Sequence, residues 1–287
     1  MSIVITGATG HVGRLVVESL LRRGVPAEQI IATGRRTEAL ADFAGRGVVV
    51  RRADYDDPAS LREAFAGADK LLLISGSEAG RRVPQHRNAI EAAKAAGVRF
   101  IAYTSIAHAD TSTLLLAAEH RATEELLAAA GVPHALLRNA WYYENYTARL
   151  PVYLAHGIVG AAGTGRLSAA TRADYAEAAA AVMTGDGHQG EVYELGGESF
   201  TMEELAEVVS AATGQTVTYT DLPVDQYTQV LVGAGLPEPV AAVFADGDRG
   251  ASAGELFVDS DDLERLIGRA PTTLAAAVST AAAVLRG

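Results

Sequence analysis

The chain has 287 residues, no cysteine and a formal net charge of −11 at pH 7, and 49% of its residues are hydrophobic. The lack of cysteine excludes disulfides, thiolate metal sites and thiol catalysis, and an acidic chain without a basic cluster argues against nucleic acid as a direct partner. This length suits one large α/β unit with an appended lobe.

The chain opens with a strand, a glycine turn and a helix, in that order. The strand is Ser2–Ile5, and an amphipathic stretch follows the turn. Gly7 permits a tight turn, Gly10 lets the backbone approach a pyrophosphate, and Gly13 lets the helix pack closely. The helix N-terminus offers free N–H groups and a positive dipole end. We therefore predict that a dinucleotide contacts Gly7, Ala8, Thr9, Gly10, His11, Val12 and Gly13.

Apolar strands then alternate with helices up to about residue 140. The predicted strands are Ile30–Thr33, Val48–Arg51, Leu71–Ile74, Phe100–Thr104 and Ala135–Leu137. The predicted helices are Glu38–Phe43, Ala59–Phe65, Asn88–Ala96 and Leu115–Ala129. Gly24, Gly97 and Gly131 each precede a valine, which is typical of a glycine C-cap leading into a strand. The alternation predicts an α/β fold with a doubly wound, parallel Rossmann-type sheet.

The pattern changes after Asn139. Aromatic residues gather at 141–146, and residues 157–168 are glycine-rich and turn-like. Later we predict a helix over Arg172–Met183, a returning strand over Glu191–Leu195, a helix over Met202–Ala212 capped by Thr201, and mostly helix after Val217. We divide the chain into a dinucleotide-binding part, 1–140, and a smaller substrate-binding lobe, 141–287, within one compact unit.

Ligands of an open parallel sheet bind outside the carboxyl ends of its strands, so the residues after each strand are candidate contacts. Arg35 follows the second strand, where an NAD-selective site usually places an acid for the ribose 2′-hydroxyl. A guanidinium suits a 2′-phosphate by its charge and its fork of donors. The alternative is an exposed arginine at a helix start. The position favours NADP(H) over NAD(H).

Two more strand ends carry candidate contacts. Asp54 follows the third strand and has two interpretations: it accepts from the adenine amino group, or it caps the helix that begins near Pro58. Ser75, Gly76 and Ser77 follow the fourth strand. Their small side chains let the chain pass close to the ribose and nicotinamide, although a plain turn would have the same sequence.

The fifth strand leads to Ser105. In short-chain reductases this strand end carries a serine or threonine near the nicotinamide, and a Tyr-x-x-x-Lys helix follows. No tyrosine here has a lysine four residues later, because the two lysines are Lys70, before the fourth strand, and Lys94, on an outer-looking helix. We therefore expect no tyrosine–lysine proton-transfer pair.

Motifs along nearly the whole chain extend this likeness. They are residues 5–10, 25–30, 70–75, 84–88, 100–105, 137–142, 170–175, 192–195 and 250–252. On these segments the chain resembles the NmrA-like branch of atypical short-chain dehydrogenases, and within it the NAD(P)H:quinone oxidoreductase type 2 and triphenylmethane-dye reductase group. The resemblance implies a cofactor held by Gly7 through Val12, by Arg35, by Ser75 to Ser77, and by Asn139, Ala140, Trp141 and Tyr142. Gly34 departs from the pattern, which has a branched apolar residue there.

The cofactor site without the proton-transfer pair predicts hydride transfer from NADPH to a quinone-like, electron-poor planar acceptor. The anion of such a product is delocalised, so the reaction needs positioning more than acid catalysis. The candidate catalytic residues are Ser105, His120 and Tyr142, of which His120 and Tyr142 are potential proton donors beside water. The alternative for His120 is a helix-surface histidine. Trp141, Tyr142 and Tyr143 either stack on the acceptor or form core of the second lobe.

Two alternatives remain open at this point: an NADP(H)-sensing regulatory protein without turnover, and a ketone or imine reductase, which would require a proton donor. We expect no flavin and no metal, since the chain has no second nucleotide fingerprint and its histidines are dispersed. An alanine-rich surface is compatible with a homodimer. Without a long apolar run or a basic leader, we expect a cytoplasmic protein with no membrane partner.

Overall fold

The computed structural model describes residues 1–78 and 80–286, and its centre is a parallel sheet of seven strands in the order β10-β6-β5-β4-β1-β2-β3. These strands are β1 (Ile3–Ile5), β2 (Ile30–Gly34), β3 (Val49–Arg52), β4 (Lys70–Leu73), β5 (Phe100–Ile106), β6 (His134–Asn139) and β10 (Val192–Leu195). The chain runs outward from β1 to β3 and then returns to β4 on the other side of β1. This reversal is the switch point at which Rossmann-type sheets bind ligands.

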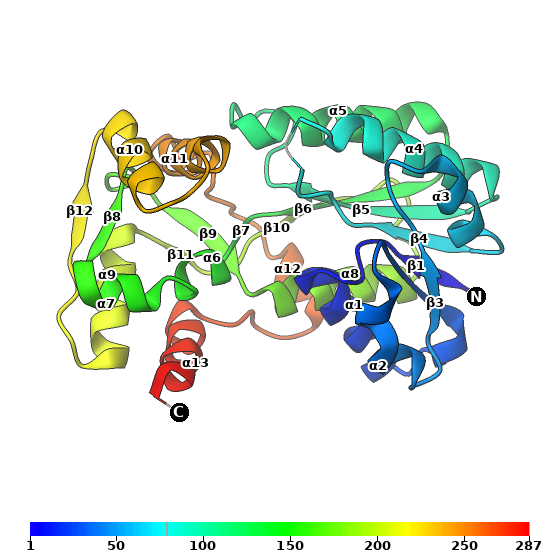
Figure 1. Cartoon of the computed structure of the whole chain (residues 1–287), viewed down its shortest axis with the longest axis horizontal. Coiled ribbons are helices and arrows are strands. Elements are labelled where there is room, and N and C mark those ends of the chain that lie inside the picture. Colours follow the sequence, from blue (N-terminus) through cyan, green and yellow to red (C-terminus); the bar gives the residue numbers. More distant parts are fainter. Residues whose placement is uncertain (79, 287) are drawn as a thin grey trace.

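Helices cover both faces of the sheet (Figure 1). One face carries α3 (Pro58–Phe65), α4 (Arg82–Ala95) and α5 (Leu115–Ala130). The other carries α1 (His11–Arg22), α2 (Ala41–Ala44), α8 (Arg172–Thr184) and α12 (Asp262–Ile267). The predicted doubly wound α/β arrangement is therefore confirmed. The short connections η1 (Ala27–Gln29) and η2 (Thr37–Leu40) are 3₁₀ turns, so the helix predicted over Glu38–Phe43 is split between η2 and α2.

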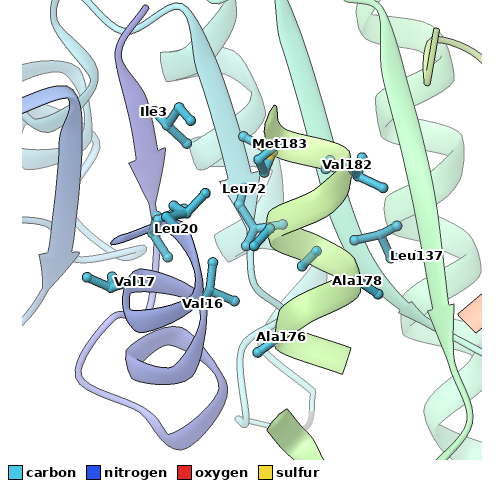
Figure 2. Packing of buried hydrophobic residues seen from close by; sticks show 14 of the residues in the cluster. Ile3, Val16, Val17, Leu20, Leu72, Leu137, Ala176, Ala178, Val182 and Met183 are labelled. Carbon is cyan, nitrogen blue, oxygen red and sulfur yellow. The ribbon is translucent and has the colours of Figure 1, made fainter. Parts of the chain in front are cut away.

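The core beneath the sheet is built by two helices from distant parts of the chain. α1 and α8 lie side by side against β1, β4 and β6 (Figure 2). The figure shows Val16, Val17 and Leu20 of α1 and Ala176, Ala178, Val182 and Met183 of α8 against Ile3, Leu72 and Leu137, all of them buried. The small alanines let α8 pack closely. Together with the pairing of β10 to β6, this packing joins later segments to the main sheet.

The remaining chain forms a lobe at the carboxyl edge of the sheet, away from the N-terminus (Figure 1). Its strands are β7 (Trp141–Tyr142), β8 (Ile158–Gly160), β9 (Leu167–Ala170), β11 (Ser199–Phe200) and β12 (Tyr219–Asp221). Its helices are α6 (Glu144–Thr147), α7 (Leu150–His156), α9 (Met202–Thr213), α10 (Val224–Gly233), α11 (Glu238–Ser252) and α13 (Leu274–Arg286). Within the described residues, no helix is long and apolar enough to cross a bilayer.

Several local predictions are confirmed and two need correction. Gly24, Gly97 and Gly131 have φ values of +80°, +75° and +71°, as helix-ending glycines require, and α9 has its capping box. However, 157–168 is not simply a turn, because β8 and the start of β9 lie in it. α4 begins six residues before the predicted start, because a proline in the first helical turn breaks no helical hydrogen bond.

Candidate active site

A cavity of about 700 Å³ lies at the carboxyl edge of the main sheet and reaches the second lobe. Nearly all predicted site residues line it: Gly7, Thr9, Gly10, His11, Val12, Gly13, Arg35, Asp54, Ser75, Gly76, Ser77, Ser105, His120, Asn139, Ala140, Trp141 and Tyr142. Ala8 is the exception. Its side chain is fully buried, because its backbone N–H donates to Thr33 O at 2.8 Å and holds the turn down onto β2.

Other residues that line the cavity were not predicted from the sequence. They include Arg36, Glu78, Arg82, Gln85, Leu116, Asn145, Arg172, Val243 and Phe244. Arg172 lies in residues 170–175, one of the segments that carry the family resemblance, so this motif could have indicated it as a site residue. Val243 and Phe244 lie on α11, and nothing local to their sequence indicates a ligand site. Tertiary packing alone brings them to the cavity.

The glycine turn presents a bare helix N-terminus to this cavity. Gly7 has a φ of +59°, and the N–H of Gly10 donates to Gly7 O at 2.9 Å, which closes the turn. α1 follows directly, and no described side chain caps it. Its first turn also lacks an acid, so its N–H groups and positive dipole end remain available for an anion. These features fit a pyrophosphate.

Three residues at the ends of β2 and β3 also line the cavity, next to the glycine turn. Arg35 has a side chain that is 66% exposed, and its guanidinium lies 3.1 Å from a carboxylate oxygen of Glu78. The departure at Gly34 has a steric reason: a Cβ there would lie 2.6 Å from Thr9 Cγ2. Asp54 lines the cavity, but its capping interpretation is wrong, since the cap of α3 is Asp57.

The segment after β4 is held in place by hydrogen bonds from two elements. The N–H of Ser75 donates to Thr104 Oγ1 at 2.9 Å, and the N–H of Gly76 donates to His86 Nε2 at 3.0 Å. The carbonyl of Gly76 accepts from Arg82 Nε at 2.8 Å. These hydrogen bonds fix the backbone of Ser75 and Gly76 at the cavity wall, and a preorganised backbone suits a ligand contact.

His120 is a buried residue of the cavity wall, with 6% of its surface exposed. The alternative of a helix-surface histidine is therefore wrong. Its Nδ1 lies 2.8 Å from the Tyr103 hydroxyl. Burial, together with the charge of Arg82 and the neighbouring His86, lowers the pKa of His120 well below 6.5. Its imidazole is neutral at physiological pH.

Ser105 lies opposite a buried ion pair. Its hydroxyl donates to Glu124 Oε1 at 2.6 Å, and the Glu124 carboxylate in turn pairs with Arg138 at 2.7 Å. Because a serine hydroxyl has one hydrogen, Ser105 can offer a ligand only its lone pairs while this bond holds. A proton-donating role for Ser105 therefore has no support in this arrangement.

Two of the three predicted stacking residues reach the cavity. The guanidinium carbon of Arg172 lies over the Tyr142 ring, 4.8 Å from the centre of that ring. Burial raises the pKa of the Tyr142 phenol, so the phenol is protonated at neutral pH. Trp141 also lines the cavity and packs over Gly247 of α11, where an added Cβ would lie 3.1 Å from the indole. Tyr143 is 1% exposed against Phe200 and belongs to the core of the lobe.

The buried histidines make stability sensitive to mild acid. Burial and Arg82 lower the pKa of His86 to about 3. Protons therefore bind first to the unfolded chain, from about pH 6.5 downward, and His86 destabilises the fold by about 2 kcal/mol at pH 5 relative to pH 7. His120 acts in the same direction, because its pKa is also lowered by burial. Asp248 opposes them by about 1 kcal/mol, because burial raises its pKa to about 6 and the folded chain takes up its proton first.

We therefore expect the free energy of unfolding to fall from pH 7 to pH 5, because the two buried histidines together outweigh the opposing effect of Asp248. Urea titrations at the two pH values measure this fall. The variant His120→Gln carries one buried imidazole fewer, so its free energy of unfolding should fall by less over the same pH range. Equal falls in the two proteins would show that His120 keeps an ordinary pKa.

Comparisons with known proteins agree with this geometry. The model of the NmrA-like family matches residues 1–274. Quinone oxidoreductase 2 of Escherichia coli K12 is 53% identical over 279 residues, which cover 96% of this chain and 97% of that protein. The structure of the E. coli NADPH-dependent quinone oxidoreductase with NADPH has a TM-score of 0.94 at 52% identity, covering 97% of this chain and 99% of that chain.

A second solved relative is the Citrobacter sp. triphenylmethane reductase in complex with NADP(H). Its TM-score is 0.93 at 40% identity, and the match covers 98% of this chain and 100% of that chain. The family match and both relatives thus span the main sheet and the lobe that together enclose the cavity. The chain belongs to the NmrA-like family.

Proposed function

We propose that this protein is an NADPH-dependent oxidoreductase that reduces a quinone-like acceptor. The observation that carries the proposal is one cavity that joins the uncapped N-terminus of α1 to an aromatic compartment beneath α11. The first part suits a dinucleotide, and the second suits a flat apolar molecule. Two similar proteins support the proposal: the E. coli protein is an NADPH-dependent quinone oxidoreductase, and the Citrobacter protein is a triphenylmethane reductase solved with NADP(H).

The residues around the first part fit NADPH. The glycine turn and the first N–H groups of α1 would hold the pyrophosphate, and Arg35 would hold the 2′-phosphate. The Arg35–Glu78 ion pair is exposed, and such pairs contribute little to stability. A 2′-phosphate, which has a higher charge than a carboxylate, would therefore replace Glu78 as the partner of Arg35. Ser75 to Ser77 and Asn139 would flank the nicotinamide. When bound, NADPH supplies a hydride.

The second part of the cavity fits a planar acceptor. Leu116, Trp141, Val243 and Phe244 give it apolar and aromatic walls, and Tyr142 adds a protonated phenol. Neither lysine is among the described lining residues: Lys70 Nζ donates to Met183 O and Gly185 O at the end of α8, and Lys94 is exposed on α4. The two candidate proton donors at the cavity, His120 and Tyr142, are both neutral at physiological pH, which suits an acceptor that needs little acid assistance.

The test is oxidation of NADPH by the purified protein in the presence of a simple benzoquinone, followed by the absorbance of the reduced nicotinamide. We expect a rate clearly above that without protein, and a much lower rate with NADH. No oxidation across several quinones and cationic dyes would overturn the proposal. Tight binding of NADPH without any turnover would instead support the NADP(H)-sensing alternative.

A further inference from the structure

We propose that His120 touches the acceptor as a neutral hydrogen-bond donor through its Nε2–H group, and that Tyr103 is the positioning residue that fixes this tautomer. The inference rests on the proposed hydride transfer and adds the class of acceptor that the site favours: one whose reduction places negative charge on an oxygen atom. Three sets of contacts support it.

The first set places the free edge of His120 in the cavity. His120 comes from α5 and Tyr103 from β5, and both side chains are more than nine-tenths buried. Nδ1 faces the core, 2.8 Å from the Tyr103 hydroxyl. In the described residues Nε2 has no hydrogen-bond partner, and it is not one of the fully enclosed unpaired atoms. Since His120 lines the cavity, Nε2 is the edge that meets a ligand.

The second set fixes the hydrogens. His86 Nε2 accepts from the N–H of Gly76, so the His86 hydrogen lies on Nδ1, which donates to Thr123 Oγ1 at 2.9 Å. The Thr123 hydroxyl donates its own hydrogen to Glu119 O at 2.9 Å. Thr123 therefore has no hydrogen left for Tyr103.

The buried Tyr103 hydroxyl must donate to an acceptor within reach. The two acceptors near it are His120 Nδ1 and the Thr123 hydroxyl, which already accepts a hydrogen bond from His86. An unprotonated imidazole nitrogen is the stronger acceptor of the two. Tyr103 therefore donates to His120 Nδ1, which leaves the hydrogen of the neutral imidazole on Nε2, at the cavity.

The third set explains why the imidazole stays uncharged. Arg82 is 6% exposed, and its guanidinium is held between Gly76 O and the Glu119 carboxylate, at 2.8 Å from each. Burial is the main cause that disfavours a charged His120 imidazole, and the charge of Arg82 together with the neighbouring His86, both from α4, adds to it. A neutral imidazole N–H held at the cavity wall stabilises an oxygen anion by a preorganised hydrogen bond.

The chemistry then balances without a protein acid. A quinone gains two electrons and one hydrogen as a hydride from NADPH, and its carbonyl oxygen takes the negative charge. His120 Nε2–H donates a hydrogen bond to that oxygen and keeps its proton. The product anion takes a proton from water on release. A cationic triphenylmethane dye gains a hydride at its central carbon and becomes neutral, so it has no oxygen anion for His120 to stabilise.

Two substitutions of His120 separate the two ring nitrogens. The amide N–H of glutamine reaches the position of Nε2, whereas the amide of asparagine reaches only that of Nδ1. With a benzoquinone, we expect His120→Asn to lower kcat/KM by about 100-fold and His120→Gln by less than about fivefold. With a cationic dye, both variants should stay within about threefold of the unmodified protein. His156→Gln, on the exposed end of α7, is the control and should match the unmodified protein with both acceptors.

The tautomer can be observed without turnover. The ¹⁵N chemical shifts of His120 should show hydrogen on Nε2 in the NADP⁺-bound protein, and a mixture of tautomers in Tyr103→Phe. The same variant should lose about tenfold in kcat with a benzoquinone and little with the dye. Hydrogen on Nδ1, or an equal loss with both acceptors, would overturn this inference while leaving the proposed function intact. Absence of turnover in the unmodified protein would contradict the proposed function, and the tautomer would still be measurable.

Discussion

Gly13→Ala is expected to weaken NADPH binding by at least about 100-fold and to lower the free energy of unfolding by about 3 kcal/mol. A Cβ at this position would lie 2.3 Å from Gly7 O and 2.7 Å from Ala8 Cα. Both neighbours are backbone atoms of the turn, so no flexible side chain can move aside. The turn must separate from α1, and the N–H groups proposed to hold the pyrophosphate then lose their arrangement.

Calorimetry with NADPH and urea unfolding measure the two effects. Gly233→Ala is a matched control, because Gly233 ends α10 and an added Cβ there meets nothing within 4 Å. That variant should bind NADPH normally and gain up to about 1 kcal/mol, since alanine favours the helix more than glycine does. Normal NADPH binding by Gly13→Ala would mean that the glycine turn does not hold the pyrophosphate.

Arg35→Ala is expected to raise the Kd for NADPH by about 10- to 100-fold and to leave the Kd for NADH nearly unchanged. A charge-assisted hydrogen bond to a phosphate contributes about 1.5–3 kcal/mol, which corresponds to this range. NADH has no 2′-phosphate and so loses nothing with the guanidinium. The variant should therefore lose most of its preference between the two coenzymes, as titration with each of them would show.

Matched variants identify which arginine binds the 2′-phosphate of NADPH. Arg62→Ala removes an exposed guanidinium from α3, away from the residues that line the cavity, and should not change either Kd. Arg36→Ala tests the neighbouring arginine, which also lines the cavity. Arg35→Lys should retain part of the preference, because lysine keeps the charge without the planar fork of donors. An unchanged Kd for NADPH in Arg35→Ala would exclude Arg35 as the phosphate contact.

Most of the main sheet was predictable because its signals are local. The strand, turn and helix around Gly7 lie within about twenty residues, and each later strand or helix shows its own apolar period. The first and last residues of helices and strands were predicted less accurately than the elements themselves. α4 begins at Arg82, before Pro84, because contacts with the loop after β4 and with α5 support its first turn. Those contacts join segments that are separate in the sequence.

The acceptor side of the cavity was less predictable for the same reason. Arg172 on α8 and Phe244 on α11 lie far along the chain from the glycine turn, yet line the same cavity. Their position depends on α8 packing beside α1 and on the lobe closing against the ends of the strands. Neither contact has a periodic signal, because each depends on the summed shape of several elements.

The sequence by itself determined the parallel sheet, the glycine turn, the arginine after β2 and the lack of a tyrosine–lysine pair, because periodicity, glycine spacing and residue type are properties of short segments. Only the tertiary structure decided that His120 is buried, uncharged and bonded through Nδ1 to Tyr103. Desolvation and hydrogen-bond direction depend on neighbours from β5 and α4, and the chain brings those neighbours to α5 only by folding.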